Sequence, residues 1–162
     1  MALRIIVVEG DEVLRKRSKE VKDINGRVLE LLDDMWETLK LSNGLGLAAP
    51  QIGVLKRVAI VNTEEEGEKI ELINPDIIES VGAVTDDEAC LSVPGLVGRV
   101  ERPEKVKVRA QNRAGEVFVL EAEGLLAKAI SHEIDHLNGI LFVDIAEEIR
   151  QIDEDYEEKA DN

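Results

Sequence analysis

Residues 131–137 read Ser-His-Glu-Ile-Asp-His-Leu, and the rest of the chain is organised around this stretch. It contains the pattern HExxH, within a segment from Leu125 to Leu137 that we expect to be a helix. With 3.6 residues per turn, His132 and His136 lie on one helix face, about 6 Å apart, close enough to bind one metal ion. Glu133 lies next to both. The pattern predicts a metal site on a helix; the alternative is two histidines on a helix surface that share no ligand.

The same helix carries an apolar face. Its apolar residues share much of one side with the two histidines, so we expect the metal-facing side to be buried. Asn138-Gly139 then ends the helix. The apolar residues are Leu125, Leu126, Ala129, Ile130 and Leu137.

Composition limits the class of protein. The chain has 162 residues, of which 44% are hydrophobic, enough for one domain with a substantial core. Its formal net charge of -15 opposes binding to nucleic acid or an anionic membrane and favours basic or neutral partners. Cys90 is the only cysteine, so no disulfide forms within the chain. Because the N-terminal apolar run is too short for a signal peptide, we expect a cytoplasmic protein.

Helical and strand patterns alternate along the rest of the chain. Apolar residues at helical spacing follow Asn25, which with Asp23 is a candidate N-cap, and Asn43-Gly44 ends that helix. Residues 57–62 and 70–78 read as one hairpin, with Asn74-Pro75 interrupting its second strand. Residues 106–109 and 117–120 read as another hairpin. The fold class is therefore α+β with antiparallel strands.

Two further segments carry unusual residues. Residues 44–53 contain three glycines and a proline, which suits close approach to a ligand or simply a structural loop, and they lack the lysine of a phosphate-binding loop. Cys90 lies between an acidic run and Pro94-Gly95, where we expect a turn. A lone cysteine is often a small buried apolar side chain, but a metal bound by two histidines needs a third ligand, and a thiolate suits it.

The end of the chain is acidic. From Asp144 to Asn162 it has nine acidic and two basic residues, with Ile145, Ile149 and Ile152 at helical spacing. We expect a helix from Asp144 that frays into a disordered tail.

Three motifs together resemble the polypeptide deformylases. The family pattern GxGLAAPQ matches Gly44 to Gln51, EGCLSxP matches Glu88 to Pro94, and QHExDHLxG matches Ser131 to Gly139. The resemblance covers roughly residues 3 to 145, with the motifs in the same order. Two positions depart from the pattern: Ala89 stands where the family usually has Gly, and Ser131 where it usually has Gln.

The resemblance implies a peptide deformylase fold. Antiparallel sheets and hairpins would pack around the central metal-binding helix, with an N-terminal helix and a C-terminal helix or tail. We expect one catalytic domain over residues 1–145, with residues 146–162 forming an acidic helix or tail.

The residues also predict a reaction. Cys90, His132 and His136 leave a fourth metal position for water; the resemblance implies Fe²⁺, while this ligand set alone equally suits Zn²⁺, Ni²⁺ or Co²⁺. Glu133 can take a proton from that water as general base. By resemblance, the substrate is the formyl group on the N-terminal methionine of a nascent peptide. The side-chain amide of Gln51 and the backbone N–H of Leu91 would then stabilise the developing oxyanion.

The resemblance further places the substrate peptide. Its backbone would form strand-like hydrogen bonds along Gly44, Leu45 and Gly46 and near Ala89. The methionine pocket should include Leu91, Leu125 and Ala129.

Two rival interpretations remain open from the sequence. A metallopeptidase would take its third ligand downstream, and the position six residues after His136 is Phe142, which leaves acidic residues such as Glu147, Glu148 or Glu157. An inactive metal-binding or ribosome-associated protein would not require Glu133 or Gln51. In some family members a basic C-terminal helix docks on the ribosome; this acidic tail has the opposite charge, so a basic ribosomal protein is the partner that it would fit.

Overall fold

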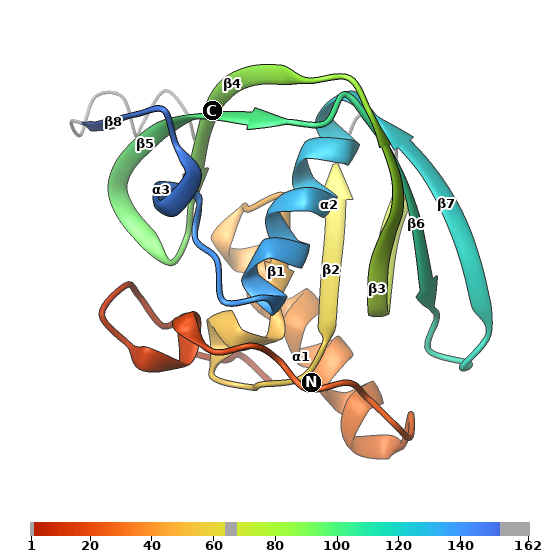
Figure 1. The fold of residues 1–162 in the computed structure, drawn as a ribbon. Coiled ribbons are helices and arrows are strands. Elements are labelled where there is room, and N and C mark those ends of the chain that lie inside the picture. Colours follow the sequence, from red (N-terminus) through yellow and green to blue (C-terminus); the bar gives the residue numbers. More distant parts are fainter. Residues whose placement is uncertain (1, 64–67, 153–162) are drawn as a thin grey trace.

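The structure is a computed structural model that describes residues 2–63 and 68–152 (Figure 1). Within that part of the chain, the strands form two antiparallel sheets around one central helix. The helix is α2 (Gly124–Leu137), as the sequence predicted. No helix in these residues is long and apolar enough to cross a membrane.

The larger sheet carries α2 on one face. Its strand order is β1-β2-β3-β6-β7, and α2 contacts β1, β2, β6 and β7. Ala127, Ile130 and Ile134 of α2 pack with Val61 and Val108 of the sheet. The strands are β1 (Gly46–Ala48), β2 (Val58–Thr63), β3 (Glu68–Val81), β6 (Lys105–Gln111) and β7 (Val117–Glu123).

Strand β2 is buried on both faces. Val58 and Ile60 pack toward α1 (Gly26–Ser42), whereas Ala59 and Val61 pack toward α2. Successive side chains of a strand point to opposite faces, so the continuous apolar run of β2 reflects a helix on each side. Both helices are thereby fixed against β1, the strand that leads into the site.

Helix α1 begins and ends where the sequence predicted. The Asn25 side chain accepts hydrogen bonds from the backbone N–H groups of Arg27 and Val28, and Asn43 has φ 58° at the C-terminal end. After Asn43, β1 runs into the 3₁₀ helix η2 (Ala49–Ile52), which brings Gln51 beneath the site. A second 3₁₀ helix, η1 (Glu12–Arg15), lies nearer the N-terminus.

The smaller sheet holds the cysteine. Its order is β4-β5-β8, with β4 (Val84–Cys90), β5 (Val93–Arg102) and β8 (Glu148–Gln151). Between β5 and α2 lies α3 (Phe142–Ile145), which packs on β5 because Gly98 leaves room for the ring of Phe142. Cys90 ends β4 and so faces α2.

The C-terminal prediction was wrong in part. The helix expected from Asp144 is limited to the four residues of α3, and Glu148–Gln151 form strand β8, hydrogen-bonded to β5. The open edge of β5 offers hydrogen-bond partners to the backbone and so favours a strand. The three apolar residues at helical spacing favour a helix only weakly. The tail expected beyond lies, from residue 153 on, outside the described residues.

One turn prediction needs correction. The chain reverses at Leu91-Ser92, and Pro94-Gly95 lies within β5, where Gly95 has φ 81°. Asn74-Pro75 interrupts the regular pairing of β3, as the sequence predicted: Asn74 has φ 53°, and the register with β6 shifts between Ile73 and Asp76, a β-bulge, after which β3 continues. The segment between β2 and β3, residues 64–67, lies outside the described part.

Candidate metal centre

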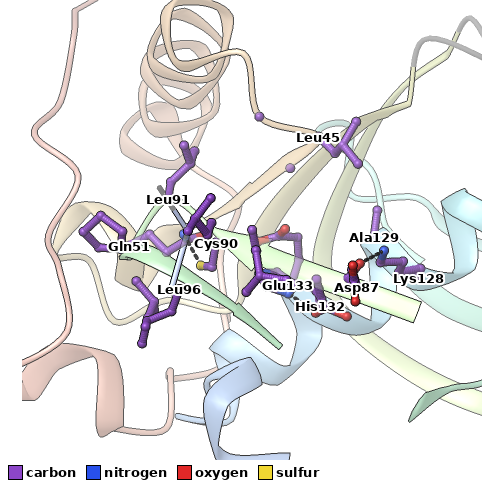
Figure 2. Close-up of a pocket in the computed structure, with 18 of the residues that line it drawn as sticks. Leu45, Gln51, Asp87, Cys90, Leu91, Leu96, Lys128, Ala129, His132 and Glu133 are labelled. Atoms are coloured by element: carbon purple, nitrogen blue, oxygen red, sulfur yellow. Dashed lines mark hydrogen bonds and ion pairs between the residues drawn. The ribbon is translucent and has the colours of Figure 1, made fainter. Parts of the chain in front are cut away.

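Three segments that are distant in sequence meet at one pocket. Helix α2 contributes His132 and Glu133, the end of β4 contributes Cys90, and η2 contributes Gln51 (Figure 2). His136, also on α2, is not among the described residues that line the pocket, but it lies next to Cys90 and His132. The two histidines are almost fully buried, as the apolar face of α2 predicted. Sequence-distant motifs therefore form a single site.

The three predicted ligands converge. The Nε2 atoms of His132 and His136 lie 3.2 Å apart, and the Cys90 Sγ lies 3.3 Å from His136 Nε2. All three donor atoms are within 4.8 Å of one another. Ligands at about 2.0 Å (nitrogen) and 2.3 Å (sulfur) around a tetrahedral ion would be about 3.3–3.6 Å apart. Burial and the neighbouring His132 hold the pKa of His136 well below its usual range, so this imidazole is neutral, as metal binding requires.

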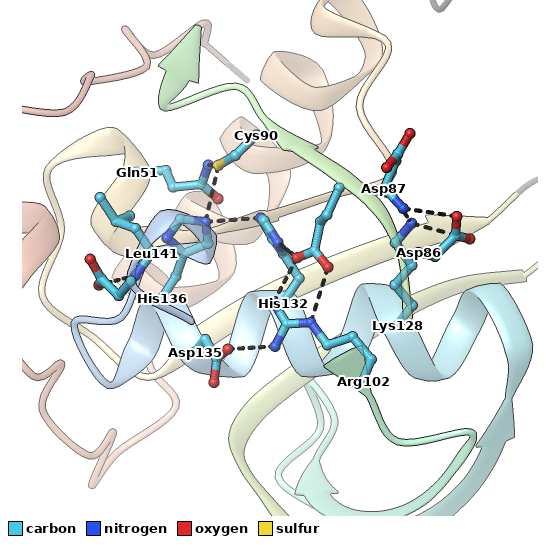
Figure 3. A network of polar contacts seen from close by, with 12 residues as sticks. Gln51, Asp86, Asp87, Cys90, Arg102, Lys128, His132, Asp135, His136 and Leu141 are labelled. Carbon is cyan, nitrogen blue, oxygen red and sulfur yellow. Dashed lines mark hydrogen bonds and ion pairs between the residues drawn. The ribbon is translucent and has the colours of Figure 1, made fainter. Parts of the chain in front are cut away.

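A buried ion-pair network orients His132 from behind. Its Nδ1 is hydrogen-bonded to the carboxylate of Glu88, which also accepts hydrogen bonds from Arg102 at 2.6 and 3.1 Å (Figure 3). Arg102 in turn donates to Asp135 at 2.5 Å. Burial raises the pKa of Glu88, but His132 and Arg102 outweigh it and lower that pKa to about 2. The carboxylate is thus ionised, and it fixes His132 with Nε2 toward the other ligands.

Glu133 lies beside the ligands without a hydrogen-bond partner for its Oε1 among the described residues. The side chain is 3% exposed, and burial raises its pKa to about 7. Its other oxygen packs against Gly46 so closely that a Cβ at Gly46 would come within 2.7 Å. A buried carboxylate with an unused acceptor and a pKa near neutrality suits proton transfer.

Gln51 is oriented at both ends of its amide. Its Oε1 accepts a hydrogen bond from the backbone N–H of Ala48 at 2.9 Å, and its Nε2 donates to the Ser92 hydroxyl at 3.1 Å. The same nitrogen lies 3.6 Å from the Cys90 sulfur. The amide N–H group is therefore held next to the predicted metal ligands; Ser92, its hydrogen-bond partner, was not predicted.

The pocket has a volume of about 480 Å³ and brings together most of the predicted substrate residues. Leu125 is the exception: it is not among the described residues that line the pocket. It lies one helical turn before Ala129, toward the start of α2, and so beyond the end of the pocket. The predicted residues that do line it are Gly44, Leu45, Gly46, Ala89, Leu91 and Ala129.

Sequence reasoning missed several residues of the site. Glu88 belongs to the motif that matches EGCLSxP, and its partner Arg102 follows that motif in the chain, but neither residue had a predicted role. Lys128 and Asp87 line the pocket near α2, and Ile152 lines it from the C-terminal end of the described chain. The HExxH segment offered one usable signal. Asp135, which lies inside it on the same helix, binds Arg102.

The fold and the possible metal site, formed by an HExxH helix and one cysteine, are those of a metal-dependent hydrolase. A family model for polypeptide deformylase matches residues 3–151. The peptide deformylase of Caldicellulosiruptor bescii is 57% identical over 144 residues, covering 89% of this chain and 86% of the relative. The chain belongs to the polypeptide deformylase family.

Solved structures agree with this assignment. A peptide deformylase from Legionella pneumophila has a TM-score of 0.86 at 45% identity, covering 89% of this chain and 86% of that one. A peptide deformylase from Synechococcus elongatus, solved with actinonin, has a TM-score of 0.86 at 40% identity, covering 90% of this chain and 79% of that one. The predicted fold class is confirmed.

Proposed function

We propose that this chain hydrolyses the formyl amide on the N-terminal methionine of newly made peptides and releases formate. One observation supports this most directly: Glu133, buried and with a free acceptor atom, lies in the same pocket as Cys90 and His132. Family membership supports the reaction class, and the pocket geometry supports these residues as its machinery.

The metal ligands in this proposal are Cys90, His132 and His136. Their donor set, one thiolate and two imidazoles, fits a divalent transition metal. Such an ion, when bound, lowers the pKa of a water molecule and polarises the substrate carbonyl. We propose Fe²⁺ as the native ion, with Zn²⁺, Ni²⁺ and Co²⁺ as alternatives; metal analysis of anaerobically purified protein identifies it.

Glu133 acts as general base and then as general acid. Its carboxylate accepts a proton as the nucleophile forms, and it returns that proton to the leaving amine of methionine. Burial supports both steps, because it brings the pKa of Glu133 close to the working pH.

Gln51 and Leu91 stabilise the charge that develops on the formyl oxygen. The Ala48 N–H fixes the Gln51 amide so that its nitrogen, not its oxygen, faces the sulfur of Cys90. The backbone N–H of Leu91, the residue after the cysteine, is the second donor. Donors held in place before the reaction cost no reorganisation during it.

Strand β1 offers an edge for the substrate backbone. It is the terminal strand of the larger sheet in the described chain, and Gly44, Leu45 and Gly46 line the pocket at its start. An extended peptide can add to such an edge by main-chain hydrogen bonds. Ala89 borders the opposite side, and Leu91 and Ala129 contribute apolar surface for the methionine side chain.

A metallopeptidase and an inactive metal-binding protein are the rival functions. In the described residues, the ligand cluster contains Cys90 and neither Glu147 nor Glu148; Glu157 lies outside them. A peptidase would cut internal peptide bonds, and an inactive protein would release no formate, so the product distinguishes all three.

The decisive experiment measures formate release from formyl-Met-Ala-Ser by Glu133→Ala. Removing a general base should lower kcat about 10²–10⁴-fold while one metal per chain is still bound. Glu147→Ala is the matched control, since it removes an exposed carboxylate and would lose activity only under the peptidase interpretation. Near-normal turnover by Glu133→Ala would remove the proposed role of this residue.

We further propose a cytoplasmic location and nascent chains on the ribosome as the source of substrate. The acidic residues 153–162 would favour a basic ribosomal protein. Co-sedimentation with ribosomes, compared between the full chain and a chain that ends at residue 152, tests that contact without removing β8.

A further inference from the structure

The C-terminal strand borders the substrate pocket. Strand β8 pairs with β5, with Gln151 opposite Leu96 and Arg150 opposite Val97. The pairing continues one residue further, because the Ile152 N–H donates to the Gly95 carbonyl at 2.9 Å. This hydrogen bond places Ile152 in the pocket wall. In sequence, Ile152 follows His132 by 20 residues.

Charged side chains hold this wall in position. Arg150 of β8 forms an ion pair with Asp87 of β4 at 2.6 Å, reaching across β5. Lys128 of α2 donates to the Asp87 carbonyl at 2.6 Å, and Arg99 lies 3.5 Å from the Asp87 carboxylate. Asp87 of β4 therefore binds both β8 and α2. These two elements border the pocket from different sides.

The pocket has two ends with the metal ligands between them. Figure 2 shows Leu96 on one side of Glu133, and Ala129 and Lys128 on the other. Ile152 belongs to the Leu96 end, where Gly95 and buried Val97 also line the pocket. This end is apolar and is built from β5 and β8.

The volume of the pocket exceeds what one methionine side chain needs. At about 480 Å³ it falls within the range of about 300–1,000 Å³ that holds a drug-sized ligand. An extended peptide advances about 3.3 Å per residue and points successive side chains to opposite sides. With methionine at the Ala129 end, the apolar end faces side chains further along the substrate.

We propose that Ile152 is a specificity-determining residue, which contacts an apolar side chain at the second or third position of the substrate. The inference rests on the proposed deformylase function and adds a C-terminal wall to its site. Arg150 is a positioning residue for that wall, through Asp87. The substrate class is therefore formylmethionyl peptides with a branched apolar residue at the second or third position.

The test compares kcat/KM for formyl-Met-Leu-Ser and formyl-Met-Ala-Leu with that for formyl-Met-Ala-Ser. The full chain should prefer one leucine peptide, and Ile152→Ser should reduce this preference about three- to tenfold, mainly through KM, because apolar contact is lost. Ile149→Ser is the matched control. Ile149 is on β8, three residues before Ile152, opposite Gly98 and 45% exposed, and is not among the described residues that line the pocket, so the ratios of Ile149→Ser should match the wild type.

A second variant, Ile152→Trp, fills the same end and should penalise the leucine peptide more than the alanine peptide. The proposal is overturned if the wild type shows no preference for leucine at either position, or if both Ile152 variants keep the wild-type ratios. If no formylated peptide releases formate, the proposed function fails together with the inference. Hydrolysis with unchanged ratios overturns the role of Ile152 alone.

Discussion

Gly46→Ala should impair catalysis without impairing the fold. The added Cβ would lie 2.7 Å from Glu133 Oε2 and 3.0 Å from its Cδ and Cγ, against an ordinary contact of about 3.4 Å. The carboxylate must therefore move by about 0.7 Å or more. Gly46 does not have a positive φ, so alanine imposes no backbone strain on β1. The three protein atoms nearest to that Cβ all belong to Glu133, so within the protein the substitution acts on the position of this side chain.

The magnitude follows from the tolerance of proton transfer to displacement. A misplacement of about 1 Å can cost about 100-fold in rate, so kcat for formyl-Met-Ala-Ser should fall about 10- to 100-fold. Metal content and the free energy of unfolding should change little, because the ligands belong to other positions. These three quantities are measured on the same preparation, by formate release, elemental analysis and urea denaturation.

Gly26→Ala is the control for the glycine-to-alanine change itself. Gly26 opens α1, and a Cβ there meets no atom within 4 Å. Its kcat should match the wild type. If Gly46→Ala were folded, bound one metal and kept kcat within twofold of the wild type, Glu133 would not require its present position, and its assignment as the proton carrier would lose its geometric basis.

Three further predictions concern other parts of the molecule. Glu88→Gln weakens the support of His132, so metal affinity should fall about 10- to 100-fold in a chelator competition; unchanged affinity would contradict the orienting role. Gly139 has φ 76°, and a Cβ there would lie 2.6 Å from the Arg15 carbonyl oxygen, so Gly139→Ala should lose about 2–4 kcal/mol in urea denaturation, and a loss below about 1 kcal/mol would refute the clash. Burial raises the pKa of Asp34, but the backbone N–H of Ala2 and the guanidinium of Arg4 outweigh burial and lower this pKa below its usual value. Its stabilisation is therefore present above the unfolded pKa of about 3.9 and is lost as the pH falls through the folded value, so the Tm difference between wild type and Asp34→Asn should shrink below about pH 4; a difference that grows there would reverse the sign.

Local sequence signals predicted α1, α2 and the β2–β3 and β6–β7 hairpins. Asn25 and Asn43 bound α1 because capping depends on the residue itself and its immediate neighbours. The C-terminal strand could not be predicted in this way, because its partner is the edge of β5, some fifty residues earlier. Ile145, Ile149 and Ile152 fit a helical period, yet hydrogen bonds to β5 decide the conformation of residues 148–151. Long-range pairing overrode a weak local pattern.

The residues of the candidate site likewise fall into those that local sequence signals predicted and those that depend on the fold. Cys90, His132 and His136 were predicted because metal ligation restricts the residue types and, on a helix, their spacing. No role was predicted for Arg102, because only the fold places this arginine between Glu88 and Asp135. Leu125 was assigned to the pocket by family resemblance, which does not show how far along α2 the pocket of this chain extends.

The two departures from the family pattern have different structural meanings. Ala89 lies in strand β4, and its φ is not positive, so a Cβ is accommodated there without strain. Its backbone therefore remains available to a substrate at the pocket wall, which it lines. Ser131 is buried, and its hydroxyl has no hydrogen-bond partner among the described residues. Because the Glu88 carboxylate already orients His132 through Nδ1, we expect the ligand geometry not to depend on a side chain at position 131. Removing the hydroxyl by Ser131→Ala should therefore leave metal binding unchanged, and it would also remove a buried polar atom that gains no hydrogen bond within the described chain.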